Sequence, residues 1–435
     1  MEGGDTSAHR ARCRDRASDS IPGIRLVRSL CRLGFGVWAP EKHNPTEVTV
    51  LSAALLRSHR PVLLATVFAV ALAPGAITGG AYGWNMVAMT WANGFTCSAT
   101  GSSATNTVPV TGATSNGSSD DYNAIQKAID SAGRRGGGIV TLPAGTFMTN
   151  RHLVLKNNVK LTGVGPATII KAGPGFLSTQ APYGGYPIIT TAGASDATIA
   201  DLTADQSGEM LNGNVSARLT GYVVEGRDSS NVVVDGVYVR NPFTYSIAMV
   251  GSTDFCVENS NVMVTTSGLY NQLDGIHILA SNSGQVIDNT IVSGDDGLVA
   301  HSIGAAVFNI LYANNKVYGG ATDAGFQLAV GDFPIYGITI EDNNFYGSYL
   351  GIHTGYYDNR TGALYNVAIS GNYIHDLSRG AQSFAIHVGG LGAYGSLGGL
   401  GSIDNVVVSN NQVCNAGPIS LQAGPGNVVT GTTGC

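Results

Sequence analysis

A short apolar phrase recurs along the C-terminal part of the chain. Each copy alternates aliphatic and small or polar residues, and turn-forming residues follow it. The copies begin at Asn231, Gln285, Asn309, Gly337, Asn366 and Asn405, and from Gln285 onward they are 24 to 39 residues apart. This spacing fits one coil of a β-solenoid plus a loop of variable length. The pattern therefore predicts an all-β fold built from short stacked strands.

Asparagine occupies the same place in several of these copies, two residues before an aliphatic residue. The positions are Asn289, Asn315, Asn372 and Asn411. Stacked asparagines can hydrogen-bond to one another along the axis of a stacked sheet. Each coil would bury its Val and Ile side chains only against its neighbours, so we predict that residues 117–435 form one domain.

One segment before the repeats has a helical pattern, from Ser119 to Gly133. Ala124, Ile125, Ala128, Ile129 and Ala132 form one apolar face. Ser119 or Asp120 can cap its start, and Gly133 can end it. A single amphipathic helix ahead of a strand array would cover the open first coil, so we predict an N-terminal capping α-helix.

A second type of strand carries the charged residues. Four segments superimpose in register: Asp274-Gly-Ile-His277, Asp296-Gly-Leu-Val299, Ala324-Gly-Phe-Gln327 and Leu350-Gly-Ile-His353. If the third residue of each points into the core, alternation places the fourth outside. The predicted outward column is Ala248, His277, Val299, Gln327, His353 and His387. Because coils stack about 4.8 Å apart, Asp274 and Asp296 become neighbours, and Asp295 and Asp323 form a second column.

Composition and charge narrow the possible partners. The chain has 60 glycines, only 12% charged residues and a formal net charge of −6. Nucleic acids and anionic membranes favour a basic surface, so neither is expected as a partner. Cysteine and histidine spacings do not resemble a zinc site, and we predict no metal or other cofactor. We expect a monomer.

The first 116 residues divide into three predicted segments. Residues 1–60 are rich in arginine without an apolar period, and we interpret them as a disordered extension or as sequence upstream of the true start. Residues 61–81 contain the core of a signal peptide, preceded by the basic Arg57 and Arg60. Residues 82–116 are interpreted as a Ser/Thr/Gly-rich linker, with an extended cap segment as the alternative for the part that follows Cys97. The protein is therefore expected to be secreted, with a retained membrane anchor as the alternative.

Four cysteines follow the expected export signal: Cys97, Cys256, Cys414 and Cys435. Four cysteines allow three pairings. Cys414 and Cys435 would close a short C-terminal loop, so we favour that pair.

Asp274, Asp295 and Asp296 are the strongest candidates for catalysis. Neighbouring carboxylates push each other's pKa values apart, which creates an acid and a base. The alternative is that each Asp-Gly pair is only a turn, but two such pairs in register favour a site. Candidate contacts to a sugar substrate are His277, Gln327, His353, Tyr245 and Tyr270, although exposed strand positions or loop packing would explain them equally well.

The helix followed by strand coils resembles the pectate-lyase-like right-handed parallel β-helix superfamily over residues 117–435. Asn271-Gln-Leu-Asp274 and Gly294-Asp295-Asp296-Gly resemble the Asn-Thr-Asp and Asp-Asp motifs of glycoside hydrolase family 28, the polygalacturonases, and related families 49 and 87. The resemblance implies an inverting hydrolase, with Asp295 as the acid and with Asp274 and Asp296 sharing the role of base. Its carboxyl groups would be about 6.5–9.5 Å apart. Asp323 would be a fourth carboxylate or a substrate contact.

The chain departs from family 28 where that family has basic residues. The Gly-His-Gly motif would fall near 322–325 and the Arg-Ile-Lys motif at 353–355, yet neither segment contains the expected His, Arg or Lys. Those residues are implied in binding a sugar carboxylate. We therefore predict a secreted polysaccharide hydrolase that acts on a neutral or weakly charged glycan.

Two other functions are compatible with the sequence. A polysaccharide lyase on the same fold would need a uronic acid substrate and a group that neutralises the substrate carboxylate. A non-catalytic, carbohydrate-binding surface β-helix would need no acid or base at all.

Overall fold

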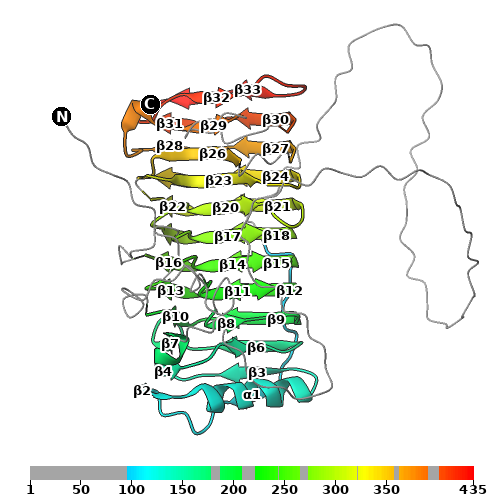
Figure 1. Cartoon of the computed structure of the whole chain (residues 1–435), viewed down its shortest axis with the longest axis vertical. Helices are drawn as coiled ribbons and strands as arrows, with labels where there is room; N and C mark the ends of the chain where they lie inside the picture. Colours follow the sequence, from blue (N-terminus) through cyan, green and yellow to red (C-terminus); the bar gives the residue numbers. More distant parts are fainter. Residues whose placement is uncertain are drawn as a thin grey trace, which may run out of the picture. The chain divides into compact units, whose positions relative to one another are not determined.

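The computed structural model describes residues 96–177, 187–207, 221–242, 244–264, 273–320, 322–356, 362–389 and 401–435. Contacts divide the chain into Met1–Asn85 and Met86–Cys435, and all described residues belong to the second unit. In that unit the strands stack into three long parallel sheets, with one α-helix at the first coils (Figure 1). The predicted right-handed parallel β-helix with an N-terminal capping helix is confirmed. The predicted segments 1–60 and 61–81 lie outside the described residues.

The first sheet, here called sheet A, takes one strand from each coil. Neighbours in the sheet are β1 (Thr107–Pro109), β3 (Gly138–Thr141), β6 (Val159–Thr162), β9 (Ser195–Ala200), β12 (Ser230–Asp235), β15 (Thr253–Glu258), β18 (Asn282–Ile287), β21 (Val307–Ala313), β24 (Ile335–Glu341), β27 (Leu364–Ser370), β30 (Ile403–Ser409) and β33 (Val428–Thr430). The apolar phrases found in the sequence lie on this sheet. Their aliphatic residues alternate between the core and the outer face, as the period of a strand requires.

Sheet B follows sheet A in each coil. Its strands are β2 (Asn116–Asp120), β4 (Gly145–Thr149), β7 (Thr168–Ala172), β10 (Thr203–Asp205), β13 (Tyr238–Arg240), β16 (Asn261–Met263), β19 (Thr290–Val292), β22 (Lys316–Tyr318), β25 (Asn344–Tyr346), β28 (Tyr373–His375), β31 (Gln412–Cys414) and β34 (Thr433–Gly434).

Sheet C completes the coil and carries the charged motifs. Its strands are β5 (Leu153–Val154), β8 (Ile189–Thr190), β11 (Val224–Arg227), β14 (Ile247–Val250), β17 (Ile276–Leu279), β20 (Leu298–His301), β23 (Ala324–Val330), β26 (Leu350–Tyr356), β29 (Ile386–Val388) and β32 (Ile419–Leu421). Two short 3-10 helices, Pro174–Leu177 and Gly380–Gln382, lie between strands.

A ladder of buried asparagines runs along the turns between sheets A and B. Each side-chain amide donates to the side-chain oxygen of the asparagine on the next coil at 2.9–3.0 Å. The members are Asn289, Asn315, Asn343, Asn372 and Asn411, each at most 1% exposed. The ladder predicted from four of these residues is confirmed, and Asn343 is an additional member.

Helix α1 (Tyr122–Arg134) covers the first coils, and Ile125, Ala128, Ile129 and Ala132 are buried in the core. The predicted cap differs in detail. The residue before the helix is Asp121, which makes no side-chain cap hydrogen bond. Its carboxylate instead accepts hydrogen bonds from the backbone and hydroxyl of Thr114 and from the backbone of Ser115, so it fixes the segment that leads into the helix.

Residues 96–116 do not behave as the predicted linker. Strand β1 pairs with β3, and Cys97 forms a disulfide with Cys256 on β15. Between these points the backbone donates to Asn158 and Asn231 on sheet A. The Ser, Thr and Gly residues of this segment are therefore packed along the sheet. The second disulfide joins Cys414 and Cys435, as predicted.

Candidate active site

The predicted register of sheet C is confirmed strand by strand. Ala248, His277, Val299, Gln327, His353 and His387 are aligned as successive Cα partners. The residue before each, aliphatic in every case except Phe326, is fully buried in the core. The column faces outward but is largely covered, since His277, Gln327 and His353 are at most 8% exposed. The alternative that the two histidines are exposed strand positions is wrong.

The Asp-Gly pairs lie at the corner where the chain enters sheet C, just before β17 and β20. A Cβ at Gly275 would lie 2.4 Å from the carbonyl oxygen of Gly297 and 2.4 Å from Ile291 in the core. Only glycine allows this close approach. Because the glycine faces the core, the preceding Asp274 and Asp296 are placed on the opposite side, against the outer face.

Three carboxyl groups meet at this corner. One oxygen from each of Asp274, Asp295 and Asp296 lies within 4.8 Å of the others. The Asp296 carboxylate also accepts the backbone N–H of Ala324 at 2.8 Å. Asp323 hydrogen-bonds to Asp295, so the second predicted column is also present. These contacts are closer than the 6.5–9.5 Å expected for an inverting pair.

Burial raises the pKa of all three aspartates. It raises the pKa of Asp295 to about 10, with further increases from the charges of Asp274, Asp296 and Asp323. The pKa values of Asp274 and Asp296 are also raised well above their ordinary range, chiefly by burial. Asp295 therefore keeps a proton at neutral pH and can act as an acid.

His277 connects the aspartates to further aromatic side chains. Its Nδ1 lies 2.6 Å from Oδ2 of Asp274, and its Nε2 lies 3.1 Å from Nδ1 of His301. The ring of Tyr245 packs 5.0 Å from the His277 ring, and Tyr222 stacks on Tyr245 at 5.3 Å. Burial lowers the pKa of His277 to about 3, so the imidazole is neutral and can accept a proton.

The remaining predicted contacts lie at different places. Gln327 and His353 pair at 3.3 Å on β23 and β26, on the C-terminal side of the aspartates. Tyr245 lies beside His277, whereas Tyr270 is outside the described residues. Their roles in binding sugar stay predictions.

Four side chains near the aspartates were missed by sequence reasoning: His301, Tyr222, Glu225 and Arg227. His301 and Arg227 are two residues beyond the outward column, so alternation alone could have placed them outside as well. Tyr222 precedes β11 by two residues, the position that Asp274 holds before β17. The predicted outward column begins at Ala248 on β14 and therefore does not include β11.

The aspartate oxygens are also the part of the described chain best suited to a metal ion. Carboxylate oxygens are the donors that Ca²⁺ prefers, but Ca²⁺ takes six to eight oxygen ligands. Asp274, Asp295 and Asp296 supply one convergent oxygen each. The raised pKa values of these carboxyl groups disfavour their charged forms, and Asp295 would have to release its proton to bind a cation at neutral pH.

The raised pKa of Asp295 gives a testable dependence of stability on pH. Between the ordinary value of 3.8 and about 10, the folded protein keeps a proton that the unfolded chain releases. Because the unfolded state binds fewer protons in this range, the free energy of unfolding must fall as pH rises through it. Urea unfolding of the wild type and of Asp295→Asn across this range should show a flatter pH dependence for the variant. Parallel curves would contradict the raised pKa.

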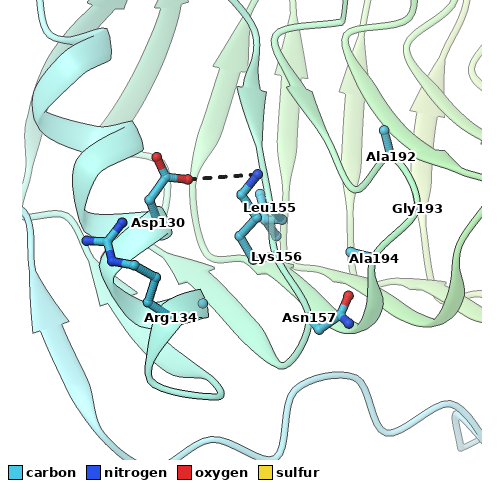
Figure 2. Close-up of a pocket in the computed structure, with 9 residues that line it drawn as sticks. Asp130, Arg134, Leu155, Lys156, Asn157, Ala192, Gly193 and Ala194 are labelled. Atoms are coloured by element: carbon cyan, nitrogen blue, oxygen red, sulfur yellow. Dashed lines mark ion pairs between the residues drawn. The ribbon is translucent and has the colours of Figure 1, made fainter.

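A separate surface cleft of about 470 Å³ lies beside helix α1 (Figure 2). Asp130 and Arg134 of the helix face Lys156 across it, and Lys156 Nζ is 3.8 Å from Asp130. Its other lining residues are Gly133 of the helix and, from the early coils, Leu155, Asn157, Ala192, Gly193 and Ala194. This cleft offers no crowded carboxyl groups, whereas the aspartates lie on later coils.

No described helix is long and apolar enough to cross a membrane. This finding does not bear on the predicted signal or anchor segment, because residues 61–81 are outside the described range.

Comparison with curated proteins finds relatives over part of the chain. Mannuronan C5-epimerase AlgE3 from Azotobacter vinelandii is 29% identical over 253 residues, which cover 55% of this chain and 13% of AlgE3. Alginate lyase 7 from the same organism is 34% identical over 148 residues, 31% of this chain and 17% of the lyase. The chain thus spans less than a fifth of the length of these two relatives, and their activities bear on it only as a proposal.

Solved structures share the fold. The exopolygalacturonase of Thermotoga maritima superimposes with a TM-score of 0.59 at 20% identity, covering 71% of this chain and 81% of the enzyme. The A-module of the Azotobacter vinelandii epimerase AlgE6 gives 0.53 at 20% identity, covering 75% and 99%. The family model described as "Rhamnogalacturonase A/epimerase, pectate lyase-like" matches residues 106–353, more than half of the chain. The chain belongs to this pectate-lyase-like family.

Proposed function

We propose that this β-helix processes a uronic acid polysaccharide by removing the proton at C5 of a sugar, next to its carboxylate. One observation carries the proposal: neutral His277 is hydrogen-bonded between Asp274 and His301, beside a carboxyl group that keeps its proton. This arrangement combines a base that can accept a proton with an acid that can donate one.

In this reaction a histidine acts as the base and an aspartate acts as the hydrogen-bond donor. His277, with Tyr245 beside it, accepts the C5 proton at Nε2, which gives up its contact with His301 for this step. The sugar carboxylate then takes up negative charge as an enediolate, and a protonated carboxyl group can stabilise such a species by donating a hydrogen bond. Asp295 is that donor. The intermediate either expels the C4 oxygen, which takes up the proton held by His277 and leaves an unsaturated lyase product, or it takes a proton from water on the opposite face, which gives an epimer while His277 returns its proton to solvent.

The relatives support an acidic substrate. Their names describe an epimerase that acts at C5 of mannuronan and a lyase that acts on alginate. The prediction of a neutral glycan depended on the missing basic residues and on the acidic character of the chain. Asp295, which keeps its proton, does not repel a uronate carboxylate, and Arg227 supplies a cation on the same sheet. We therefore favour a uronate polymer over a neutral one.

Glycoside hydrolysis is the second candidate. It is favoured by the doubled Asp295-Asp296 one coil after Asp274, as the resemblance to polygalacturonases implied. In that case Asp295 would protonate the glycosidic oxygen, and Asp274 and Asp296 would activate a water. The contact distances below 4.8 Å leave less space than an inverting pair uses, so we place this candidate second.

Secretion is part of the proposal. Disulfides persist mainly in oxidising compartments, and the described chain has two. A polymeric substrate outside the cell agrees with that location.

Deuterium exchange separates the two candidates. Alginate, polygalacturonate and neutral α-glucans are incubated with the protein in D₂O, and products are examined by NMR and by ultraviolet absorbance of unsaturated sugars. C5 chemistry predicts deuterium at C5 or unsaturated ends on a uronate polymer. New reducing ends without either signal would establish hydrolysis and refute the proposal.

His277→Gln should lower the rate of C5 exchange by about 10²–10⁴-fold, because the glutamine amide cannot accept the proton. The matched control is His375→Gln, which removes a histidine bonded to Asp376 on sheet B. The control should keep the wild-type rate. An unchanged exchange rate in His277→Gln would exclude His277 as the base.

A further inference from the structure

An ion pair on β11 contains a basic side chain that the aspartate chemistry does not use. Nε of Arg227 lies 2.9 Å from Oε1 of Glu225, and Nη2 lies 2.5 Å from the same oxygen. The Glu225 side chain is only 5% exposed, whereas the Arg227 side chain is 42% exposed. The acid is thus buried in the protein, and the guanidinium group faces outward.

The register places this pair on the same outer face as the candidate active site. Arg227 aligns with Val250, then Leu279, then His301 along sheet C. Strand β11 is two coils before β17, about 10 Å along the stack of coils. Arg227 is also in register with Leu279, five residues along the strand from Asp274, so it suits a sugar unit further along the polymer than the one held at the aspartates.

Tyr222 connects the Glu225–Arg227 ion pair with the candidate active site. Burial raises its pKa, and the charges of Glu225, Arg227 and Asp274 all act on its phenol. Its ring stacks on Tyr245, which packs against His277. A continuous surface of aromatic and polar side chains therefore runs from the ion pair to the proposed base.

Glu225 also fixes how the guanidinium is presented. Both contacts use one edge of the arginine, and the hydroxyl of Thr190 donates to the other carboxylate oxygen of Glu225 at 3.2 Å. A guanidinium has five N–H donors in a fixed plane. The donors that do not face Glu225 remain for a planar acceptor such as a carboxylate.

On the C-terminal side of the aspartates, the outward side chains of sheet C are neutral rather than charged. Gln327, His353 and His387 follow one another on β23, β26 and β29, and the pKa values of both histidines are lowered by burial. These groups are neutral and suit sugar hydroxyls. Along sheet C, the cation thus lies on the side that precedes the aspartates.

We infer that Arg227, held by Glu225, binds the carboxylate of a second uronate unit of the same polymer, away from the unit processed at Asp274, Asp295 and Asp296. This inference rests on the proposed function for its substrate. On sheet C itself it places a charged unit over β11 and uncharged contacts over β23 to β29, while Arg379 packs 4.4 Å over the ring of Tyr349 just before β26.

The test measures binding in the Asp295→Asn background, which removes turnover. Calorimetry compares Arg227→Gln with its parent, using uronate oligosaccharides and the same oligosaccharides with carboxylates reduced to alcohols. We expect a roughly 10–100-fold weaker affinity for the uronate and no change for the reduced oligosaccharide, because one charge-assisted contact is lost. Arg227→Lys should recover part of the loss.

The matched control is Arg240→Gln. Arg240 on β13 is 46% exposed and pairs at 2.8 Å with buried Asp205, on sheet B rather than sheet C. Its removal should leave both affinities unchanged, and thermal melting confirms that each variant is folded.

The possible results distinguish a failure of the inference about Arg227 from a failure of the proposed function. Equal affinities of parent and Arg227→Gln for the uronate, or equal weakening for both oligosaccharides, overturn the inference. A parent that binds only neutral glycans overturns the inference and the proposed substrate together. Hydrolysis of a uronate without C5 exchange, with the Arg227 effect intact, overturns only the proposed chemistry.

Discussion

Asp295→Asn is expected to lower activity on the natural substrate by about 10²–10⁴-fold while the protein stays folded. Burial and three neighbouring carboxyl groups raise the pKa of Asp295 to about 10, so the wild type presents a proton at neutral pH. Asparagine has nearly the same shape but cannot transfer that proton. Since the substitution also removes one member of a crowded acidic group, it should not destabilise the fold.

The measurement is the rate of C5 exchange, or of reducing-end formation if the protein is a hydrolase. Asp342→Asn is a suitable control, because Asp342 is exposed, adopts a left-handed backbone conformation that asparagine also tolerates, and lies outside the site. An unchanged rate in Asp295→Asn would remove Asp295 from the mechanism. If Asp295→Asn changes neither the activity nor the affinity for any glycan, the result would support a non-catalytic surface β-helix.

The fold followed from the sequence because a solenoid repeats its local rules. Every coil must place aliphatic residues inside and a turn residue at the same corner, so copies such as those at Gln285 and Asn366 report the same geometry. The alignment of His277 with Val299 and Gln327 followed from this period alone, and it is correct.

The contacts of the site were harder to predict, since they depend on side chains that converge from different coils. His301 contacts His277 through a diagonal between neighbouring strands, which a column of aligned residues does not reveal. Burial was also underestimated for His277 and His353. A period places a side chain outside the core but does not tell whether another part of the chain covers it.

Residues 96–116 show a different limit of prediction from sequence, namely that amino-acid composition is ambiguous. The Ser, Thr and Gly residues of this segment are typical of a linker, but small residues also allow a backbone to lie close against a sheet. Gly101 illustrates this, since a Cβ there would be 2.2 Å from the Thr198 hydroxyl. Composition alone does not distinguish the two.

Asn343→Ala is expected to lower the free energy of unfolding by about 3–9 kcal/mol, at about 1–3 kcal/mol for each buried group left without a partner. In the wild type, the Asn343 amide donates to the backbone carbonyl of Tyr312 and to Asn372, and its oxygen accepts from the backbone and side chain of Asn315. Alanine leaves the Tyr312 carbonyl and two donors of Asn315 unsatisfied in the core.

Urea unfolding at constant pH, with both disulfides intact, measures the effect. Asn123→Ala is the control: Asn123 is exposed on helix α1, and its side chain accepts one bond from Arg151. That loss should be within about 0.5 kcal/mol. Comparable losses in the two variants would mean that water replaces the missing partners and that the ladder is dispensable. A much larger loss in Asn343→Ala would establish that coils of this solenoid are joined through buried amides as well as through aliphatic packing.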